Sequence, residues 1–600
     1  MPRARPRPGQ PDLGPNVLVF DPGMATADIQ AKVDAVASEQ VSNQFGAQRY
    51  ALLFKPGTYG TAQHPLIVNV GYYTEVAGLG LSPTDVTING QVDVYNQCFP
   101  TAPGAPTDCT ALDNFWRSLS NLSINVAGGT GCRANTEFWA VSQAAPMRRV
   151  QVTGNVTLQD YCTAGPQYAS GGFIADSAFV GGTIINGGQQ QFYTRNSALD
   201  GWTNGVWNQV FSGDVGAPAQ SFGAPGPTPG SLANPYTTLD TTPVSREKPF
   251  LYVDTRGVWR VFVPAARKDS RGTSWQAGQP GRSVPLRDFF VARPSDSVAT
   301  INAALARGRN LLITPGVYDI PRSIAVRRAD TVVLGLGIAT LTAQRGAVAM
   351  TVADVPGVDI AGLTFDAGPV NSPALLRVGT RDENEDVRGR NGRGRRAAAS
   401  AADPTAIQDV FFRIGGPHVG KAAVSLEVNS NHTIVDDIWA WRADHGTGVG
   451  WTVNTAATGV VVNGDHVTAT GLFVEHYQRY NTIWNGEHGR TVFYQNELPY
   501  DAPDQAAWRH GRVNGYAAYK VADSVRTHEA WGLGSYIFTN VDPTLHASNA
   551  FEVPVRHGVR MHDMVTISLN KAGTIDHVVN GVGDPVTPTH QGPSNVVTYP

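Results

Sequence analysis

Two glutamates in the last third of the chain, Glu475 and Glu497, are 22 residues apart. In a fold whose backbone repeats at about that interval, they would stack on neighbouring rungs roughly 5 Å apart. Glycoside hydrolysis needs two carboxyl groups, one of them protonated so that it can help the leaving oxygen depart. A nearby negative charge raises the pKa of that acid. The alternative is a row of solvated surface residues without chemistry.

Aromatic residues crowd the same region of the sequence. Flat apolar ring faces with polar tips suit sugar rings and their hydroxyl groups. We therefore expect a carbohydrate-active site. Its expected substrate-binding side chains are Trp439, Trp441, Tyr477, Trp484 and Tyr500.

An internal duplication indicates the elements that must position these residues. Each copy reads as an amphipathic helix, then a strand ending in Pro-Gly, then a strand ending in Gly-Leu-Gly. The first copy covers residues 26–37, 50–60 and 73–80, and the second covers 297–308, 310–320 and 330–337. Two copies of one opening unit predict two domains of the same kind.

After each opening, short segments rich in Val, Ile and Thr recur at about 20 to 25 residues, broken by Gly or Asn. This pattern predicts an all-β chain built of parallel β-helices, in which each coil buries the apolar face of its neighbour. The opening helix would cap the exposed strand edges. A β-propeller is less favoured, because no blade motif of roughly 40 to 50 residues repeats.

Composition sets the expected domain boundaries. Residues 217–287 are rich in Pro, Gly and Ser and contain a strand pair, so we interpret them as a linker. The charge run at 381–403 is interpreted as a surface insertion. The expected parts are an N-terminal tail at 1–15, a first β-helix at 16–216, the linker at 217–287, a second β-helix with the catalytic glutamate at 288–566, and a C-terminal segment at 567–600.

The overall balance of residue types excludes several classes of protein. The 600 residues are 42% hydrophobic and 16% charged, with a net charge of −3. The high apolar content argues against disorder. The small net charge gives no electrostatic attraction toward nucleic acid or anionic membranes. No apolar run is long enough to span a bilayer.

The four cysteines, all in the first third, allow three pairings. We prefer the local pairing Cys98–Cys109 and Cys132–Cys162, and the alternative is four reduced, buried thiols. Two disulfides indicate a secreted, extracellular protein. The basic, proline-rich N-terminus lacks the apolar stretch of a signal peptide. Either a signal precedes this numbering, or export uses another route, or the protein stays inside the cell.

The glutamate region resembles a motif of glycoside hydrolase family 55. The matching segments are EHY at 475–477, which includes His476, and QNELPY at 495–500. In the first half, GGQQQFYTRNS at 187–197 is similar to a further segment of that family. The resemblance extends from about residue 16 to about residue 566.

Family 55 implies two tandem right-handed parallel β-helices in one chain, with the site between them. It implies an inverting, exo-acting β-1,3-glucanase that releases glucose from laminarin-like glucans. Carried over by position, Glu497 matches the general acid and Glu475 its proton-sharing partner. Trp441 and Tyr500 match positions that would line the sugar subsites, and His476 belongs to the same motif.

The catalytic water is harder to assign. In an inverting enzyme it attacks from the face opposite the acid, which points to the first domain. Gln143, Gln191 and Ser197 are the candidates to hold it. Gln143, Gln167 and Gln191 are spaced by 24 residues and would form one ladder if the coils had that length.

Two other functions are alternatives to a β-1,3-glucanase. A polysaccharide lyase also uses a β-helix, but it needs calcium-binding carboxylates and a basic residue to take a proton. A β-helical adhesin or tail-spike protein would bind glycans without cleaving them. We expect no cofactor and no metal, because Asp436, Asp437, Asp444 and His445 lack the tight loop of a calcium site. We expect a monomer whose partner is its glucan substrate.

Overall fold

The computed structural model describes residues 11–100, 107–163, 168–203, 205–276, 278–380 and 400–600. Gln167 and most of the charge run at 381–403 lie outside these ranges. The chain divides into two compact units. The first unit is Met1–Arg293 with Ile313–Val317 and Gly335–Ala339, and the second is Pro294–Leu312, Tyr318–Leu334 and Thr340–Pro600.

The first unit is built around one long sheet of parallel strands. Along its path lie β1 (Val17–Phe20), β2 (Tyr50–Phe54), β5 (Thr74–Gly78), β9 (Arg117–Val126), β11 (Met147–Thr153), β13 (Phe173–Ala175), β16 (Gln191–Arg195), β18 (Asn208–Ser212) and β19 (Tyr236–Leu239). Beside this path, β6 (Val86–Asp93) pairs with β3 (Gly57–Tyr59) and β4 (Leu66–Asn69). A smaller sheet contains β10 (Thr136–Phe138), β12 (Asn155–Thr157) and β15 (Ile184–Ile185). Parallel strands joined by successive coils form a β-helix.

Helix α1 (Thr26–Gln40) packs on the core of the first unit, at the place where the duplication predicts a helix. It buries Ile29, Val33 and Val36. The side chain of Gln30 donates to the carbonyl of Ile67 at 2.6 Å and accepts from its N–H at 3.0 Å. These two bonds satisfy backbone groups of β4 that have no neighbouring strand on that side.

The two disulfides lie in the first unit. Cys98 is bonded to Cys109 and Cys132 to Cys162, which confirms the predicted pairing. Cys98 begins β7 (Cys98–Pro100) and Cys109 ends the antiparallel strand β8 (Thr107–Cys109).

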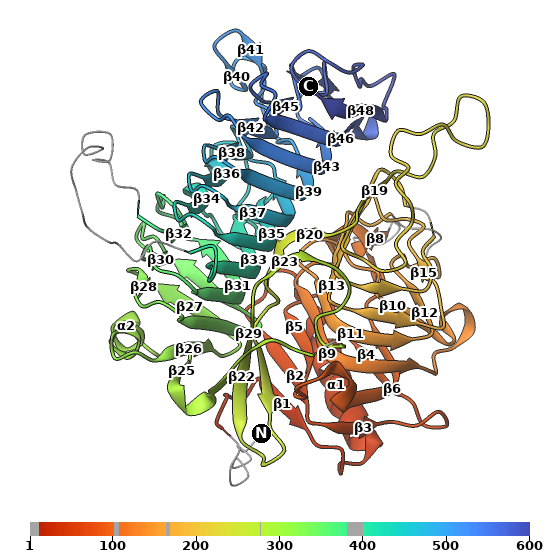
Figure 1. Cartoon of the computed structure of the whole chain (residues 1–600), viewed down its shortest axis with the longest axis vertical. Helices are drawn as coiled ribbons and strands as arrows, with labels where there is room; N and C mark the ends of the chain where they lie inside the picture. Colours follow the sequence, from red (N-terminus) through yellow and green to blue (C-terminus); the bar gives the residue numbers. More distant parts are fainter. Residues whose placement is uncertain (1–10, 101–106, 164–167, 204, 277, 381–399) are drawn as a thin grey trace. The chain divides into compact units, whose positions relative to one another are not determined.

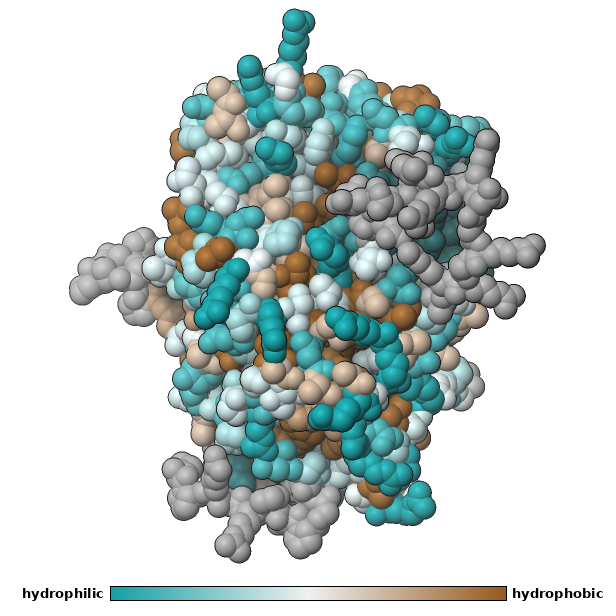
Figure 2. All heavy atoms as spheres, turned by 90° about the vertical axis from the view of Figure 1, so that its left-hand side faces the viewer, coloured by the Kyte–Doolittle hydropathy of each residue, from teal (hydrophilic) through white to brown (hydrophobic). Residues whose placement is uncertain are grey.

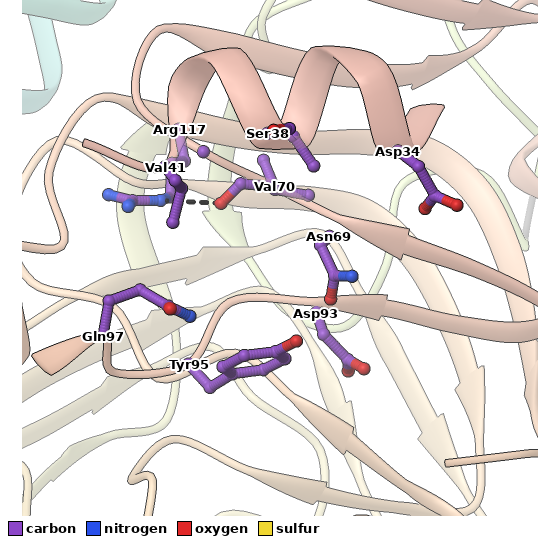
Figure 3. Close-up of a pocket in the computed structure, with 11 residues that line it drawn as sticks. Asp34, Ser38, Val41, Asn69, Val70, Asp93, Tyr95, Gln97 and Arg117 are labelled. Carbon is purple, nitrogen blue, oxygen red and sulfur yellow. Dashed lines mark hydrogen bonds between the residues drawn. The ribbon is translucent and has the colours of Figure 1, made fainter. Parts of the chain in front are cut away.

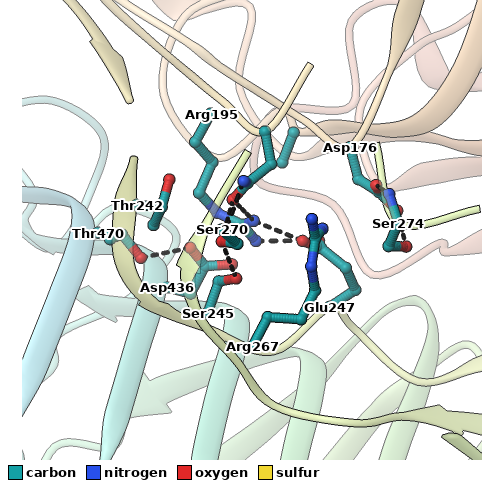
Figure 4. Close-up of polar contacts among 12 residues, drawn as sticks. Asp176, Arg195, Thr242, Ser245, Glu247, Arg267, Ser270, Ser274, Asp436 and Thr470 are labelled. Carbon is teal, nitrogen blue, oxygen red and sulfur yellow. Dashed lines mark hydrogen bonds and ion pairs between the residues drawn. The ribbon is translucent and has the colours of Figure 1, made fainter. Parts of the chain in front are cut away.

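Residues 217–287, which composition assigned to a linker, are folded into the first unit. They contribute β19 to the main sheet, the antiparallel pair β20 (Thr242–Ser245) with β23 (Arg267–Ser270), and a sheet of β21 (Phe250–Val253), β22 (Trp259–Pro264) and β24 (Gly281–Pro285). A buried ion pair and a buried hydrogen bond hold this segment to the β-helix. Arg195 contacts Glu247 at 2.5 and 3.0 Å, and Asp176 accepts from the Ser274 hydroxyl at 2.8 Å (Figure 4).

The second unit stacks two parallel sheets (Figure 1). One sheet includes β31 (Asp359–Ala367), β33 (Ala406–Ile414), β35 (Ile434–Arg442), β37 (Thr468–Glu475), β39 (Gly489–Glu497), β43 (His528–Ile537) and β46 (Val559–Ser568). The other contains β28 (Ile324–Val326), β30 (Met350–Val352), β32 (Leu376–Val378), β34 (Ala422–Val428), β36 (Ala456–Val462), β38 (Thr482–Trp484), β42 (Tyr519–Val521) and β45 (Phe551–Glu552). Helix α2 (Val298–Ala306) lies near the start of this unit, as α1 lies near the start of the first. The prediction of an all-β chain with two parallel β-helices is confirmed.

The C-terminal segment closes the second β-helix. Strand β48 (Ser594–Tyr599) pairs antiparallel with β46, so the last coil does not end on an open parallel edge. No helix among the described residues is long and apolar enough to cross a membrane. On the face drawn in Figure 2, hydrophobic side chains are interspersed with hydrophilic ones.

The coils of the second unit stack by register although their lengths differ. Equivalent residues on β37 and β39 are 22 positions apart, but those on β39 and β43 are 39 apart. The regular spacing of 20 to 25 residues is therefore wrong for much of this unit, because loops of different lengths join the strands. The strands themselves bury one aliphatic and aromatic row: Val410, Ile438, Leu472, Tyr494, Leu533 and Met564.

A corner in left-handed backbone conformation interrupts each strand at one register position. It is occupied by Gly362, Asp409, Asp437, Gly471, Phe493, Gly532 and Asp563. Glycine and aspartate tolerate this conformation, whereas Phe493 is a bulky exception with φ of 66°. Because the corner recurs in every coil, the residues that follow it keep the same alternation from coil to coil.

Candidate active site

Glu475 and Glu497 lie on adjacent strands, as their spacing predicts. Strand β37 pairs with β39 through Phe473 and Gln495, and two residues further on the same register places Glu475 beside Glu497. The N–H of His476 donates to the carbonyl of Glu497 at 2.8 Å, which continues the ladder. The row extends on both sides. In order, it contains Asp366, Arg413, Trp441, Glu475, Glu497 and Tyr536.

Glu475 is 3% exposed, and side chains rather than backbone groups hold its carboxyl group. The indole N–H of Trp439 donates to its Oε2 at 2.7 Å. Burial raises the pKa of Glu475 well above its usual value, and the charge of Glu497 raises it further. The carboxyl group is therefore suited to keeping a proton.

Glu497 is 9% exposed, so it is the more accessible of the two acids. The hydroxyl of Tyr500 donates a short hydrogen bond to its Oε2, and Nε2 of His476 lies 3.8 Å from the same oxygen. Burial raises the pKa of Glu497, while His476 and Tyr500 act in the opposite direction by stabilising the carboxylate. An acid with a raised pKa and hydrogen-bonding partners on one oxygen is equipped to transfer a proton.

Asp444 is a third acid of the site, and sequence reasoning weighed it only as a metal ligand. Asp444 is exposed, with about a quarter of its side chain accessible. Partial desolvation raises its pKa, but a hydrogen bond from His445 and the proximity of His476 outweigh this and hold the pKa at about 2. Nδ1 of His445 lies 2.9 Å from Oδ1 of Asp444. Asp444 thus stays ionised, and its charge contributes to the raised pKa of both Glu475 and Glu497.

The aromatic residues of the site separate into two groups. Trp439 and Trp441 stack with their ring centres 5.0 Å apart, and Trp441 also contacts His445 at 5.3 Å. Tyr500, which is partly exposed, packs edge-on against His476 at 4.3 Å. Trp439 and Trp441 are each only 1% exposed, so neither ring presents an open face in this structure, and Trp439 positions Glu475 through its indole N–H.

Two predicted sugar-binding residues lie elsewhere. Tyr477 is fully buried, and its hydroxyl bonds Ser425 at 2.5 Å. Trp484 is also fully buried, on β38 of the other sheet, where it stacks on Tyr519. Neither ring presents a face to a ligand, so their assignment as sugar-binding residues is not supported by this structure.

The three first-unit candidates for holding the water differ in whether their side chains have hydrogen-bonding groups that are still unused. The Gln143 side chain contacts Ser170, and Oγ of Ser197 accepts from the N–H of Ser177 and donates to the carbonyl of Arg195. Gln191 is fully buried, and neither its amide oxygen nor its amide nitrogen has a hydrogen-bond partner among the described residues. It alone keeps free hydrogen-bonding capacity.

The glutamine ladder does not form between Gln143 and Gln191. Strand β13 is offset by 27 residues from β11 but by only 20 from β16. Continuing this register places Gln191 level with Gly171 and Ala144, and the equal spacing of 24 residues matches neither step. Gln167 lies outside the described residues.

The fold and the buried acid pair define a β-helical glycoside hydrolase, and comparison with known proteins agrees. Residues 289–497 match the LAM55 pectate lyase-like domain. An exo-β-1,3-glucanase of Streptomyces sp. SirexAA-E is 52% identical over 593 residues, which is 99% of this chain and 90% of that protein. The chain belongs to glycoside hydrolase family 55.

Solved structures of that Streptomyces enzyme, sacteLam55A, superpose on this chain. One covers 98% of this chain and 99% of that one with a TM-score of 0.86. Another, with the same TM-score and 51% identity, is a glutamate-to-alanine variant in complex with glucose. A probable glucan endo-1,3-β-glucosidase of Arthroderma benhamiae is 26% identical over 170 residues, 26% of this chain.

Proposed function

We propose that this protein is an exo-acting β-1,3-glucanase that hydrolyses laminarin-like β-glucans and releases glucose. The observation that carries the proposal is the pair Glu475 and Glu497, which lie on adjacent rungs with raised pKa values and side-chain hydrogen-bond donors. The full-length similarity to an enzyme named exo-β-1,3-glucanase supports the substrate and the mode of attack.

In this proposal Glu497 is the general acid. It gives its proton to the glycosidic oxygen as the bond to the anomeric carbon breaks, and a water molecule attacks that carbon from the opposite face. The attacking water releases its proton to solvent, and Glu497 regains a proton from solvent through Glu475, with which it shares protons. Within the second unit, Trp441, Tyr500 and His476 lie beside the two acids.

The state of Glu475 favours inversion of the anomeric carbon. Retention would require a second, ionised carboxylate as nucleophile, roughly 5–5.5 Å from the acid. Glu475 is close enough, but its burial and raised pKa favour the neutral form, which is a poor nucleophile. NMR of the first product before mutarotation tests this. Initial α-glucose is expected, and initial β-glucose would make Glu475 the nucleophile.

Incubation with laminarin separates this function from its competitors. Released glucose is expected, without an unsaturated product. A lyase would give an unsaturated sugar, and a glycan-binding protein would retain the polymer without cleaving it. Following chain length over time tests the exo mode, because exo attack releases glucose from the start while the remaining polymer shortens slowly.

We further propose that the protein acts outside the cell as a monomer. The two disulfides support an oxidising compartment. Assay of culture medium against cell extract tests the location, and light scattering coupled to size-exclusion chromatography tests the mass of 63.9 kDa.

A further inference from the structure

The first unit has a polar pocket of about 270 Å³, and neither Glu475 nor Glu497 lines it. It lies between α1 and the ends of β4 and β6, and the chain that follows β6 forms its floor (Figure 3). Its volume is below the roughly 300–1,000 Å³ usual for drug-sized ligands, so it suits a single small ring. Asp34, Asn69, Asp93 and Tyr95 are among the polar side chains that line it.

An aromatic ring forms part of the pocket. Tyr95 lies below Asn69 and beside Asp93 in Figure 3. The guanidinium of Arg133 stacks 4.0 Å from the centre of the Tyr95 ring and is itself paired with Asp160 at 3.0 Å. Since Arg133 does not line the pocket, it supports the ring from outside. A ring fixed in this way presents a flat apolar surface of the kind on which the C–H face of a sugar stacks.

Several hydrogen-bonding groups converge on the same space. Oδ1 of Asp93 accepts from the N–H of Phe138 at 2.9 Å, which fixes the direction of that carboxyl group. Asn69 Oδ1 is buried and has no hydrogen-bond partner among the described residues. An acceptor left in this state costs about 1–3 kcal/mol unless a water or a ligand donates to it. Ligand hydroxyl groups would supply that donor.

The charges of the pocket narrow the class of ligand. The carboxyl groups of Asp34 and Asp93 disfavour an anion. Arg117 also lines the pocket, but carbonyls of Val70 and Phe115 hold its guanidinium at 2.9 and 2.6 Å. No group of three or more acidic, histidine or cysteine side chains in the described part of the chain is arranged to hold a metal ion. A neutral ligand rich in hydroxyl groups fits all of these features.

We propose that this pocket is a second carbohydrate-binding site, which holds one hexopyranose ring of a β-1,3-glucan chain at a place separate from Glu475 and Glu497. The choice of glucan rests on the proposed function, whereas the choice of a sugar rests on the pocket itself. Such a site would keep the enzyme on an insoluble polymer between rounds of hydrolysis.

Retention on insoluble β-1,3-glucan particles tests the site, with the whole chain carrying Glu497→Gln so that the particles stay intact. In this background Tyr95→Ala is expected to weaken retention at least about fivefold, and Asn69→Ala to weaken it less. Tyr95→Phe keeps the ring and is the matched control, with retention within about twofold. With Glu497 intact, Tyr95→Ala is expected to hydrolyse soluble laminaritriose within twofold of the wild-type rate.

The two assays distinguish the failure of this proposal from that of the proposed function. Unchanged retention for both Tyr95→Ala and Asn69→Ala, in proteins that melt as the parent does, would overturn the second site and leave a pocket filled by water. Absence of laminaritriose hydrolysis by the wild type would overturn the glucanase function. In that case NMR titration with glucose still tests the pocket, with perturbed signals expected for residues near Tyr95 in the wild type and not in Tyr95→Ala.

Discussion

Each unit contains a buried pair of raised-pKa acids, and the two pairs differ in the groups that hold them. The second unit has Glu475 and Glu497, and the first has Asp93 and Glu137. Burial is the main cause of a raised pKa in all four, and the charge of the other acid in the pair adds to it for Glu475 and Glu137. Asp93 reaches a pKa of about 7. By pKa alone, the two pairs could not be told apart.

The hydrogen-bond partners separate the two pairs. Both carboxylate oxygens of Glu137 accept from the N–H of Val92, at 3.2 and 3.0 Å, and Asp93 accepts from the N–H of Phe138. These bonds join β6 to β10, whose backbones pair with each other only at the bridge of Val94 with Trp139, just beyond the two strands, among the described residues. In the second unit the donors are the side chains of Trp439 and Tyr500. A carboxyl group that accepts from the backbone N–H of a neighbouring strand takes the place of a backbone hydrogen bond and is part of the fold. A carboxyl group held by side chains leaves the hydrogen bonds between its own strands intact and is available for chemistry.

Replacing the acid of each pair by its amide gives the largest expected contrast. Glu497→Gln keeps the shape but removes the transferable proton, so hydrolysis of laminarin should fall by roughly 10²–10⁴-fold while the melting temperature changes little. Initial rates on unactivated glucan measure this effect.

Glu137→Gln is the matched control for Glu497→Gln. Its amide nitrogen would face the N–H of Val92 in a fully buried site, so a loss of about 1–3 kcal/mol of stability is expected with catalysis nearly unchanged in the folded protein. Retention of a third of wild-type activity by Glu497→Gln would remove the acid assignment.

Glu475→Gln should lower activity less, by about 10- to 100-fold, and change the pH profile. In the wild type, the pair loses its second proton when the other carboxyl group is already charged. That charge opposes the loss, so the second ionisation takes place at high pH. The substituted amide carries no charge, so Glu497 alone should lose its proton at lower pH, and the alkaline limb of kcat/KM should move in that direction. An alkaline limb at the wild-type position would make Glu475 a structural residue.

Tyr500→Phe should move the same limb the opposite way, with only a few-fold loss of rate. The hydroxyl of Tyr500 stabilises ionised Glu497 and lowers its pKa, so removing it raises the pKa and keeps the acid protonated to higher pH. Tyr477→Phe is the matched control, because its hydroxyl bonds Ser425 in the core. A shift of equal size in both variants would show that the effect does not come through Glu497.

Sequence patterns were sufficient for the parts that depend on local spacing. The duplicated helix and strands, the disulfide pairs and the one-coil step between Glu475 and Glu497 follow from neighbours in the chain. The step is right because the connections from β37 to β38 (476–481) and from β38 to β39 (485–488) are both short. The longer steps elsewhere depend on loops whose lengths obey no period, which is why the ladder from Gln143 to Gln191 fails.

Side-chain direction was the other part that spacing could not supply. In a regular strand Tyr477 would point to the same side as Glu475. His476 between them adopts a left-handed conformation with φ of 67°, so the alternation is broken and Tyr477 turns into the core. The sequence suggests only a metal-binding role for Asp444, because its influence on the two glutamates acts through space, and its spacing along the chain does not reveal that influence.

The smallest expected effect concerns the pH dependence of stability through the first pair. The folded pKa of Asp93, about 7, is above its ordinary value of 3.8, chiefly because the site is buried. A group with a raised folded pKa stabilises the protein below its unfolded pKa, and this contribution is lost as the pH rises through the folded pKa. Wild-type stability should therefore lose this contribution between about pH 4 and pH 7, whereas Asp93→Asn has no such group to lose. The melting temperature of Asp93→Asn relative to wild type should accordingly rise by a few degrees from pH 4 to pH 7.5, as measured by calorimetry in matched buffers. Parallel curves would mean that Asp93 titrates alike in the folded and unfolded chains, and the first pair would then lose its resemblance to Glu475 and Glu497.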